Sequence, residues 1–311
     1  MKPVVLTRNK FPMPVEARLA EEFQIVHALP GEEHRLADPA AIEAVATNGY
    51  AKADAGFMAR FPNLKLIASM SVGTDHIDLR QAGERRIAVT NIIDVHNHCV
   101  ADLGLGLIIA AARNIVFGDR YVRAGKWVSR PAPLGMKLGG KTLGILGLGK
   151  IGRLLASRAE AVGLKIAYCN RRKIDGVSYA YIADPIGLAE QVDIFAVIIP
   201  ANAQTENIVS ERLLAALGPA GFLINLARGS LVDDAALISA LKERRIAGAA
   251  LDVFRNEPHV RGEYLELDNV VLTPHLGSAT SETRVAMGMA MLQNLIAYFA
   301  GERPPNLVTL K

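Results

Sequence analysis

The sequence contains little cysteine, few aromatic residues and no long apolar run. Its two cysteines, Cys99 and Cys169, lie far apart and form no CxxC pair, which argues against a disulfide framework and against a cysteine-based metal centre. The longest apolar run, residues 105–112, is much shorter than the roughly 20 residues that cross a bilayer, and no basic, cleavable signal precedes it. We therefore expect a soluble, cytoplasmic protein with free thiols.

Neither sign of charge dominates. Lys and Arg total 35 and Asp and Glu total 31, giving a net charge of +4, and the two signs are interspersed along the chain. A nucleic-acid-binding surface usually needs clustered basic residues, so we expect neither nucleic acid nor membrane as a partner. The slight positive excess suits small anionic ligands.

The length of 311 residues predicts two domains, and alternating strand-like and helix-like segments predict an α/β fold. We expect a smaller, flavodoxin-like domain at residues 1–96 and 284–311, and a Rossmann-like domain with a doubly wound parallel sheet at 97–283. In the first domain, strands are predicted at 4–6, 25–27, 64–69 and 87–91, with helical segments at 16–23 and 39–45. In the second, strands are predicted at 142–146, 165–169, 193–199, 222–226, 247–253 and 269–272. Helices are predicted at 101–116, before a glycine- and proline-rich loop, and at 281–299, returning to the first domain.

A glycine-rich GxGxxG motif directly follows the predicted strand 142–146 and opens a helix that runs to about residue 161. In this context the first glycine permits a tight turn, the second lets the backbone approach a pyrophosphate, and the third lets the helix pack on the strand. The helix N-terminus supplies amides and a partial positive charge. We therefore predict a dinucleotide site at Gly147, Leu148, Gly149, Lys150, Ile151 and Gly152.

The end of the next strand indicates which dinucleotide binds. An NAD enzyme carries an acidic residue about 20 positions beyond the motif, where it binds the ribose 2′-hydroxyl. This chain has Asn170, Arg171 and Arg172 there, and two guanidiniums favour the 2′-phosphate of NADPH. NADH is the weaker alternative, and both arginines could instead belong to a solvated turn.

Three polar residues follow strands of the second domain: Arg228, Glu257 and His275. Singly, each has an ordinary interpretation, as a surface ion pair, a loop carboxylate and a hydrogen-bonded core histidine. Ligands of open α/β sheets bind beyond the carboxyl ends of the strands. We therefore expect these three side chains to face one cleft.

The sequence resembles the D-isomer-specific 2-hydroxyacid dehydrogenases over nearly its whole length. The likeness rests on GLGKIG (147–152), INLARGSLVDDAAL (224–237), AALDVFRNEP (249–258) and TPHLGSAT (273–280). Within that family it is most similar to the NADPH-dependent glyoxylate/hydroxypyruvate reductases, including the plant hydroxyphenylpyruvate type, through SVGTDHIDL (71–79), RYVRAGKW (120–127) and NRR (170–172). The resemblance implies NADPH-dependent reduction of a small 2-keto acid to the D-2-hydroxy acid in a cleft between a substrate domain and a cofactor domain.

The resemblance also implies roles for the three polar residues. Arg228 would bind the substrate carboxylate and polarise the adjacent carbonyl, and His275 would donate the proton. Glu257 would orient His275 and favour its charged form, because a carboxylate stabilises an adjacent imidazolium.

Further residues are assigned by the resemblance alone. The turn Ser71, Val72 and Gly73 would present amides to the substrate carboxylate, and Asn48, Gly49 and Tyr50 would line the cleft. Asp252 would bind the nicotinamide carboxamide. The remaining expected cofactor contacts are Ile199, Pro200, Leu226, Ala227, Gly277 and Ser278.

The segment His96, Asn97, His98 and Cys99 departs from the family pattern, in which a leucine, a threonine and aspartates precede the long helix. A metal site is an alternative here, but His96 and His98 would diverge on a helix and no further ligands lie nearby in sequence. We therefore predict a hinge beside the cleft and no metal. Its unusual residues leave the size of the substrate open.

Three alternative functions compete with this interpretation. A dinucleotide-sensing corepressor on the same scaffold would be expected to carry extra tails or a peptide-docking surface. A formate dehydrogenase needs no proton donor. The Glu257 and His275 pair would supply one, and this argues against that function. A D-3-phosphoglycerate dehydrogenase often adds a regulatory domain, and this is the nearest enzymatic alternative.

The long apolar helix at 101–116 predicts a homodimer. We expect it to expose more apolar surface than one core can cover, at Leu103, Leu107, Ile108, Ala111 and Ile115. The loop after Trp127 would then reach the partner's cleft.

Overall fold

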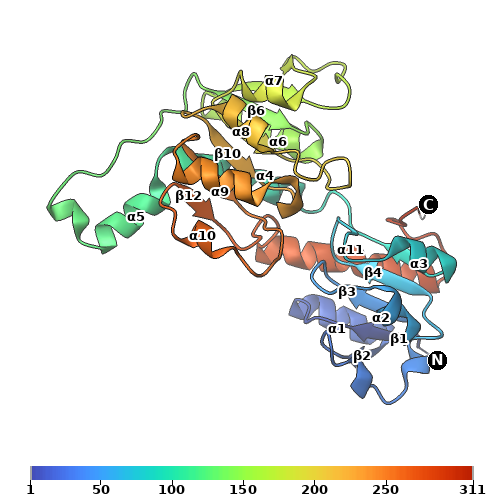
Figure 1. Cartoon of the computed structure of the whole chain (residues 1–311). Helices are drawn as coiled ribbons and strands as arrows, with labels where there is room; N and C mark the ends of the chain where they lie inside the picture. Colours follow the sequence, from blue (N-terminus) through green and yellow to red (C-terminus); the bar gives the residue numbers. More distant parts are fainter. Residues whose placement is uncertain (1, 310–311) are drawn as a thin grey trace. The chain divides into compact units, whose positions relative to one another are not determined.

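In the computed structural model, which describes residues 2–309, the chain divides into two compact units. The second unit comprises Asn97–Ser278, and the first comprises the residues before it together with those from Ala279 onward. The chain thus re-enters the first unit at Ala279 rather than at residue 284. The whole of helix α11 (Ser281–Phe299) and its N-cap Thr280 therefore belong to the first unit (Figure 1).

The first unit is built on a five-stranded parallel sheet with the order β2-β1-β3-β4-β5, which is the flavodoxin-like order. The strands are β1 (Val4–Thr7), β2 (Gln24–His27), β3 (Ala44–Thr47), β4 (Leu66–Ser69) and β5 (Ala88–Thr90). Every residue of β3 and β4 is buried, because these strands pair on both sides and are covered on both faces.

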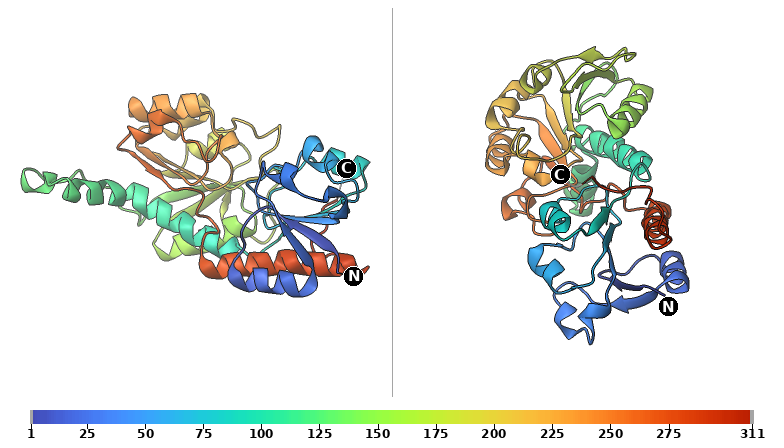
Figure 2. Two further views of the ribbon diagram at one scale, coloured as in Figure 1. Left: turned by 90° about the horizontal axis from the view of Figure 1, so that it is seen from below. Right: turned by 90° about the vertical axis from the view of Figure 1, so that its right-hand side faces the viewer.

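Helices cover both faces of this sheet. Val5, Ala46 and Leu66 face a core shared with α1 (Met13–Glu22) and α11, which lie side by side (Figure 2). Leu6, Val45 and Ile67 face the opposite core, shared with α2 (Ala55–Ala59) and α3 (Leu79–Glu84). Asp54 and Asp78 cap these short helices by accepting hydrogen bonds from backbone amides. The connections include two 3₁₀ turns, η1 (Glu33–Arg35) and η2 (Pro39–Ala41).

The second unit is built on a seven-stranded parallel sheet with the order β12-β11-β10-β9-β6-β7-β8. This is the doubly wound Rossmann order with one added edge strand, β12, and its switch point lies between β6 and β9. The strands are β6 (Thr142–Leu146), β7 (Lys165–Cys169), β8 (Ala180–Tyr181), β9 (Ile194–Val197), β10 (Phe222–Asn225), β11 (Gly248–Leu251) and β12 (Val270–Leu272). The short strand β8 was not predicted.

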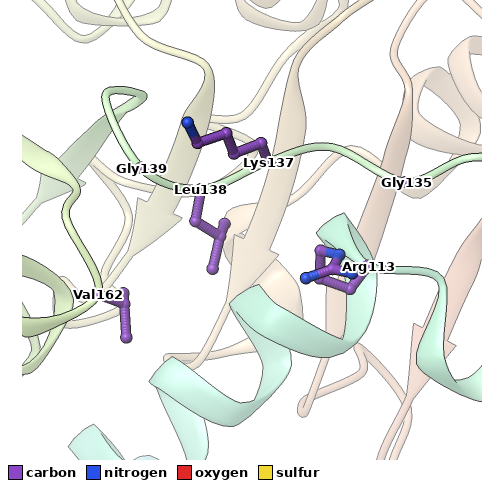
Figure 3. A pocket seen from close by; sticks show the side chains of 6 residues that line it. All are labelled: Arg113, Gly135, Lys137, Leu138, Gly139 and Val162. Carbon is purple, nitrogen blue, oxygen red and sulfur yellow. The ribbon is translucent and has the colours of Figure 1, made fainter.

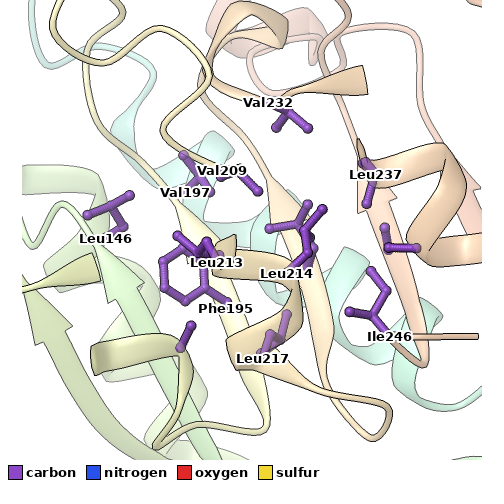
Figure 4. Packing of buried hydrophobic residues seen from close by; sticks show 14 of the residues in the cluster. Leu146, Phe195, Val197, Val209, Leu213, Leu214, Leu217, Val232, Leu237 and Ile246 are labelled. Atoms are coloured by element: carbon purple, nitrogen blue, oxygen red, sulfur yellow. The ribbon is translucent and has the colours of Figure 1, made fainter. Parts of the chain in front are cut away.

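Alternate residues of these strands enter two different cores. Leu146, Phe195 and Val197 pack against α7 (Pro185–Ala189), α8 (Glu211–Leu217) and α9 (Asp234–Lys242) (Figure 4). Residues of the opposite parity, such as Ile145 and Ala196, pack against α4 (Asn97–Ala112) and α6 (Lys150–Ala161). The remaining helices are α5 (Ile115–Arg123), α10 (Gly262–Leu265), η3 (Lys126–Val128) and η4 (Gly229–Leu231). In Figures 1 and 2, α5 and the chain after it stand out from the rest of this unit.

Two predicted helices are wrong in detail. The helix predicted at 39–45 is the single 3₁₀ turn η2 followed by β3, because Ala44–Thr47 is a fully buried strand between β1 and β4. The helix predicted at 101–116 begins earlier, at Asn97, and ends at Ala112. It stops there because Asn114 takes a left-handed conformation, with φ of 54°, and starts α5 in a new direction.

The residues chosen as the exposed face of the long helix are also largely wrong. Leu107, Ile108 and Ala111 are buried in the core of the second unit, where they help α4 cover the sheet. Ile115 is exposed, and Leu103 is partly buried.

Within residues 2–309, no single helix is long and apolar enough to cross a bilayer. Helices α4 and α5 taken together have the length and composition of such a span, but the chain bends by 58° between them.

Candidate active site

The glycine-rich loop joins β6 to α6 at the carboxyl edge of the second sheet. Gly147 has φ of 105°, and a Cβ there would lie 2.6 Å from the carbonyl oxygen of Ile198. A Cβ at Gly152 would lie 2.4 Å from the carbonyl oxygen of Gly147, so only glycine lets the helix start this close to the strand. At Gly149, the N-cap of the 12-residue helix α6, no atom lies within 4 Å of a Cβ position. The loop is therefore packed against protein atoms at Gly147 and Gly152 and leaves space at Gly149, where a pyrophosphate could approach the backbone.

Asn170, Arg171 and Arg172 follow β7, and Asn170 lies beside this loop. The Asn170 side chain accepts a hydrogen bond from the Leu148 amide at 2.7 Å, which ties the end of β7 to the glycine-rich loop. Arg171 and Arg172 are exposed. Two guanidiniums near a pyrophosphate cradle suit a dinucleotide with a 2′-phosphate.

His275 and Glu257 form a close pair. The distance from His275 Nδ1 to Glu257 Oε2 is 2.7 Å, and Glu257 Oε1 accepts a hydrogen bond from the Phe254 amide at 2.9 Å. Burial would raise the pKa of Glu257, but these hydrogen bonds and the charges of His275 and Arg228 outweigh burial and lower it. The carboxylate is therefore ionised at neutral pH. It can orient the imidazole of His275 and provides a negative charge beside the ring.

The loop that carries His275 is held by Asp252. His275 has φ of 54°, a conformation that is unfavourable for a residue with a side chain. The carboxylate of Asp252 accepts hydrogen bonds from Thr273 Oγ1 and the Leu276 amide, both at 2.7 Å, and from the Gly277 amide at 2.9 Å. Asp252 is 1% exposed, and burial raises its pKa despite these hydrogen bonds. Asp252 thus fixes the backbone on both sides of His275, a role that sequence analysis missed.

Arg228 lies on the loop after β10, next to the loop after β11 that carries Glu257. Its carbonyl oxygen accepts a hydrogen bond from Asn225 Nδ2 at 2.9 Å, and the Ala227 amide donates to Asn225 Oδ1 at 3.1 Å. Its own Nη1 donates to the Ala227 carbonyl oxygen at 2.7 Å. Asn225 therefore shapes this loop and was also missed, although a polar residue at the end of a buried apolar strand was a usable signal.

The other expected cofactor contacts lie at the same edge of the sheet, because parallel strands all end there. They are Ile199 and Pro200 after β9, Leu226 and Ala227 after β10, and Gly277 and Ser278 after β12. A Cβ at Gly277 would lie 3.3 Å from Asp252 Oδ2, so glycine allows the amide to approach the carboxylate.

Two loops predicted to bind substrate lie together in the first unit. A Cβ at Gly49, in the loop after β3, would lie 3.3 Å from Ser71 Cβ, in the loop after β4. Ser71 Oγ donates to the Gly73 carbonyl oxygen at 2.7 Å, which tightens the turn. Val72 and Tyr50 are exposed. Substrate binding by these two loops stays a prediction.

The segment 96–99 spans the division between the units. His96 ends the first unit, and the buried Asn97 begins α4. His98 Nδ1 lies 3.2 Å from Arg158 Nη2, and Arg158 also pairs with Asp102. In the described part of the chain, residues 2–309, no three His, Cys, Asp or Glu side chains come close enough to hold a metal ion.

A groove of about 500 Å³ lies elsewhere on the second unit and is not part of this site. It adjoins the segment that leads into β6, at the amino edge of the sheet (Figure 3). Its lining residues are Arg113, Gly135, Lys137, Leu138, Gly139 and Val162.

Known proteins share both the sequence and the fold. Residues 105–277 match the family model described as D-isomer specific 2-hydroxyacid dehydrogenase, NAD binding domain. The chain is 48% identical over 261 residues to glyoxylate/hydroxypyruvate reductase A of Arabidopsis thaliana, covering 84% of this chain and 83% of that one. It is 40% identical over 298 residues to 2-ketogluconate reductase of Gluconobacter oxydans, covering 96% of each chain.

A solved structure is similar over both units. It is the NADPH-dependent glyoxylate/hydroxypyruvate reductase of Sinorhizobium meliloti in complex with NADP and malonate, with a TM-score of 0.92 and 39% identity. The match covers 99% of this chain and 97% of that chain.

Proposed function

The chain belongs to the family of D-isomer-specific 2-hydroxyacid dehydrogenases, and we propose that it reduces glyoxylate and hydroxypyruvate to their 2-hydroxy acids with NADPH. Reduction of small 2-keto acids is the activity of its relatives. The plant relative at 48% identity and the structural relative with a TM-score of 0.92 both carry glyoxylate/hydroxypyruvate reductase as their name. The NADP in the second of these supports the choice of NADPH, as do Arg171 and Arg172, which directly follow the residue that binds the glycine-rich loop.

The observation that carries this proposal is the His275 and Glu257 pair, 2.7 Å apart, on loops at the same edge of the sheet as Arg228 and the glycine-rich loop. When bound, the dinucleotide supplies the hydride. Glu257 accepts the Nδ1 hydrogen of His275, which leaves Nε2 to hold the proton that passes to the keto oxygen. Arg228 binds the substrate carboxylate through its planar fork of N–H donors and polarises the adjacent carbonyl.

Steady-state kinetics with purified enzyme test the proposal. Glyoxylate, hydroxypyruvate, 2-ketogluconate and hydroxyphenylpyruvate are each assayed with NADPH and with NADH. We expect the highest kcat/KM with glyoxylate or hydroxypyruvate and NADPH. A higher kcat/KM with 2-ketogluconate or hydroxyphenylpyruvate would contradict the proposed substrates. A preference for NADH would contradict the proposed cofactor.

We further propose that the enzyme is a homodimer. Of the residues first chosen from the sequence, only Ile115 is exposed, and the other residues that support a dimer follow it in the chain. The apolar side chains Ile115, Val122, Trp127, Val128 and Leu134 are between 53% and 96% exposed on α5 and the segment after it. Large exposed apolar side chains that recur along one segment are typical of an interface between subunits.

Light scattering at micromolar concentration tests the homodimer. We expect twice the chain mass for the wild type, and a shift toward the monomer when Trp127 and Val128 are both changed to Glu. The control is Met13→Glu, an equally exposed apolar residue of the first unit, which should remain dimeric. A monomeric wild type would exclude the dimer.

A cytoplasmic location is also part of the proposal. Neither Cys99 nor Cys169 forms a disulfide, which suits a reducing compartment.

A further inference from the structure

The guanidinium of Arg255 joins three loops at the carboxyl edge of the second sheet. Arg255 itself lies in the loop after β11. Its Nη1 donates to Glu206 Oε1 at 3.1 Å, and its Nη2 donates to Asn207 Oδ1, both in the loop after β9. The same Nη2 donates to the carbonyl oxygens of Ser230 at 3.3 Å and Val232 at 3.1 Å, in the loop after β10.

These three loops are consecutive along the sheet, and two of them carry the proposed catalytic residues. Ser230 lies two residues after Arg228, and Arg255 lies two residues before Glu257. The Arg255 side chain is 31% exposed and also lies 4.0 Å from the carboxylate of Asp234. It is therefore a partly buried cation with ordered acceptors on more than one element, unlike a solvated surface arginine.

The backbones of the two loops that carry Arg228 and Glu257 are in direct contact beneath this guanidinium. A Cβ at Gly229 would lie 2.0 Å from the carbonyl carbon of Phe254 and 2.2 Å from the amide nitrogen of Arg255. The Phe254 amide in turn donates to Glu257, which contacts His275. A displacement at residues 254–255 would therefore reach Arg228 on one side and His275 on the other.

We propose that Arg255 is a positioning residue that sets the geometry of both Arg228 and the Glu257 and His275 pair. This inference rests on the proposed function. Arg255 touches none of the reacting groups. It acts by clamping the loop after β11 to the loops after β9 and β10, so that Arg228 and the Glu257 and His275 pair are held at the separation that the substrate needs.

The test is Arg255→Met, with Arg245→Met as a matched control. Arg245 is also 31% exposed and also pairs with two carboxylates, those of Glu211 and Glu243, but none of its acceptors lies on a loop that carries an active-site residue. We expect Arg255→Met to lower kcat by about 10- to 100-fold, since small misplacements of reacting groups have effects of this size. KM for the keto acid should rise and KM for NADPH should stay unchanged. The alkaline limb of the activity profile should move to lower pH, because the Glu257 contact to His275 loosens.

The outcomes distinguish a failure of this inference from a failure of the proposed function. A wild type inactive with every keto acid contradicts the proposed function before any variant is compared. An active wild type with an Arg255→Met variant that has unchanged kcat, KM and pH profile overturns the positioning role, even if its melting temperature falls. Equal losses in Arg255→Met and Arg245→Met also overturn it.

If Arg255→Met does not fold, Arg255→Lys tests the positioning role instead. Lysine keeps the charge but cannot reach three loops at once. We expect an intermediate kcat and a smaller shift of the alkaline limb in the same direction. Wild-type kinetics in Arg255→Lys would overturn the inference.

Discussion

At the scale of single residues, the chemistry of the site depends on which neighbour each nitrogen of His275 faces. Nδ1 faces the carboxylate of Glu257 at 2.7 Å, and that carboxylate is also anchored by the Phe254 amide. The pKa of Glu257 is lowered, because hydrogen bonds and positive charges outweigh its burial. Glu257 therefore stays charged down to acidic pH, and its carboxylate holds Nδ1 of His275 in a fixed orientation.

We predict that Glu257→Gln moves the alkaline limb of keto-acid reduction to lower pH. Glutamine keeps a hydrogen-bonding group beside His275 but removes the charge that stabilises the imidazolium. A donor that is less readily protonated works over a shorter range on the alkaline side. The pH dependence of kcat/KM measures this, and NADPH binding should be unchanged.

The control for this prediction is His275→Ala, which should remove most turnover at every pH. If Glu257→Gln moves only the acid limb, or lowers kcat equally at all pH values, Glu257 does not charge His275.

Cofactor choice also belongs to the residue scale. We predict that changing both Arg171 and Arg172 to Ala raises KM for NADPH by about one to three orders of magnitude, since two charge-assisted contacts are lost, while NADH kinetics change little. Arg212→Ala, at an exposed arginine of α8, serves as the control. Equal losses with both cofactors would mean that the arginines support the fold.

Asn170→Asp refines this prediction. A carboxylate can still accept the Leu148 amide, as Asn170 does, so the glycine-rich loop should keep its shape. The added charge should repel a 2′-phosphate and shift the preference toward NADH.

At the scale of secondary-structure elements, the entry of α6 is set by glycines with different surroundings. Gly152 lies against the backbone of Gly147, whereas Gly149 has open space where a Cβ would be. We predict that Gly152→Ala costs about 1–3 kcal/mol of stability, because the new methyl group must displace backbone atoms. Gly149→Ala should change stability by less than about 1 kcal/mol and instead weaken NADPH binding.

Urea unfolding and NADPH titration by fluorescence measure the two effects. Similar stability losses in both variants would contradict this account of the loop, as would undiminished NADPH binding in Gly149→Ala.

The same scale shows why two predicted elements were wrong. The pattern of residues 39–45 suited a helix, but the apolar residues from Ala44 onward form β3, since a buried strand and a buried helical turn share the same composition. The apolar residues of α4 were expected to face a second subunit, but Leu107 and Ile108 are buried in the core of the unit to which α4 belongs. Periodicity indicates that a face is buried and leaves open which surface covers it.

At the scale of the whole molecule, each unit has its own core, and the first unit contains a buried ion pair. Arg8 Nη2 lies 2.8 Å from Glu33 Oε1, with side chains that are 5% and 2% exposed. The Arg8 guanidinium also stacks over Phe57, 3.9 Å from the ring centroid. Burial would raise the pKa of Glu33, but hydrogen bonds from its own amide, from Arg8 and from the Gly31 amide lower it.

We predict that Glu33→Gln destabilises the enzyme by about 3–5 kcal/mol at pH 7, because Arg8 is left buried without a counter-charge. The control is Glu43→Gln, which breaks the exposed pair with Lys65 and should cost less than about 1 kcal/mol. Since the pKa of Glu33 lies below its ordinary value of 4.5, its contribution is present above that pH and is lost as the pH falls below it. Urea unfolding measures the free energy of unfolding of the wild type and of Glu33→Gln from pH 7 to pH 3. The difference between the two should become smaller as the pH falls. A constant difference would contradict an ionic origin of the effect.

The sequence by itself determined which residues meet at the candidate site. Nearly continuous apolar strands predict parallel sheets, and parallel strands end at one edge, so Arg228, Glu257, His275 and the glycine-rich loop had to share that edge. The length and spacing of the strands were sufficient for this, because they depend on local pattern.

The tertiary structure alone decided how those residues are held. Asp252 reaches Leu276 across 24 positions, Asn170 reaches Leu148 across 22, and Arg255 reaches Glu206 across 49. Such contacts depend on the path of each loop, and loop paths follow from packing between elements rather than from local composition. For the same physical reason, the sequence pointed to an apolar long helix, and only the folded unit revealed that the exposed apolar surface lies on the segment after it.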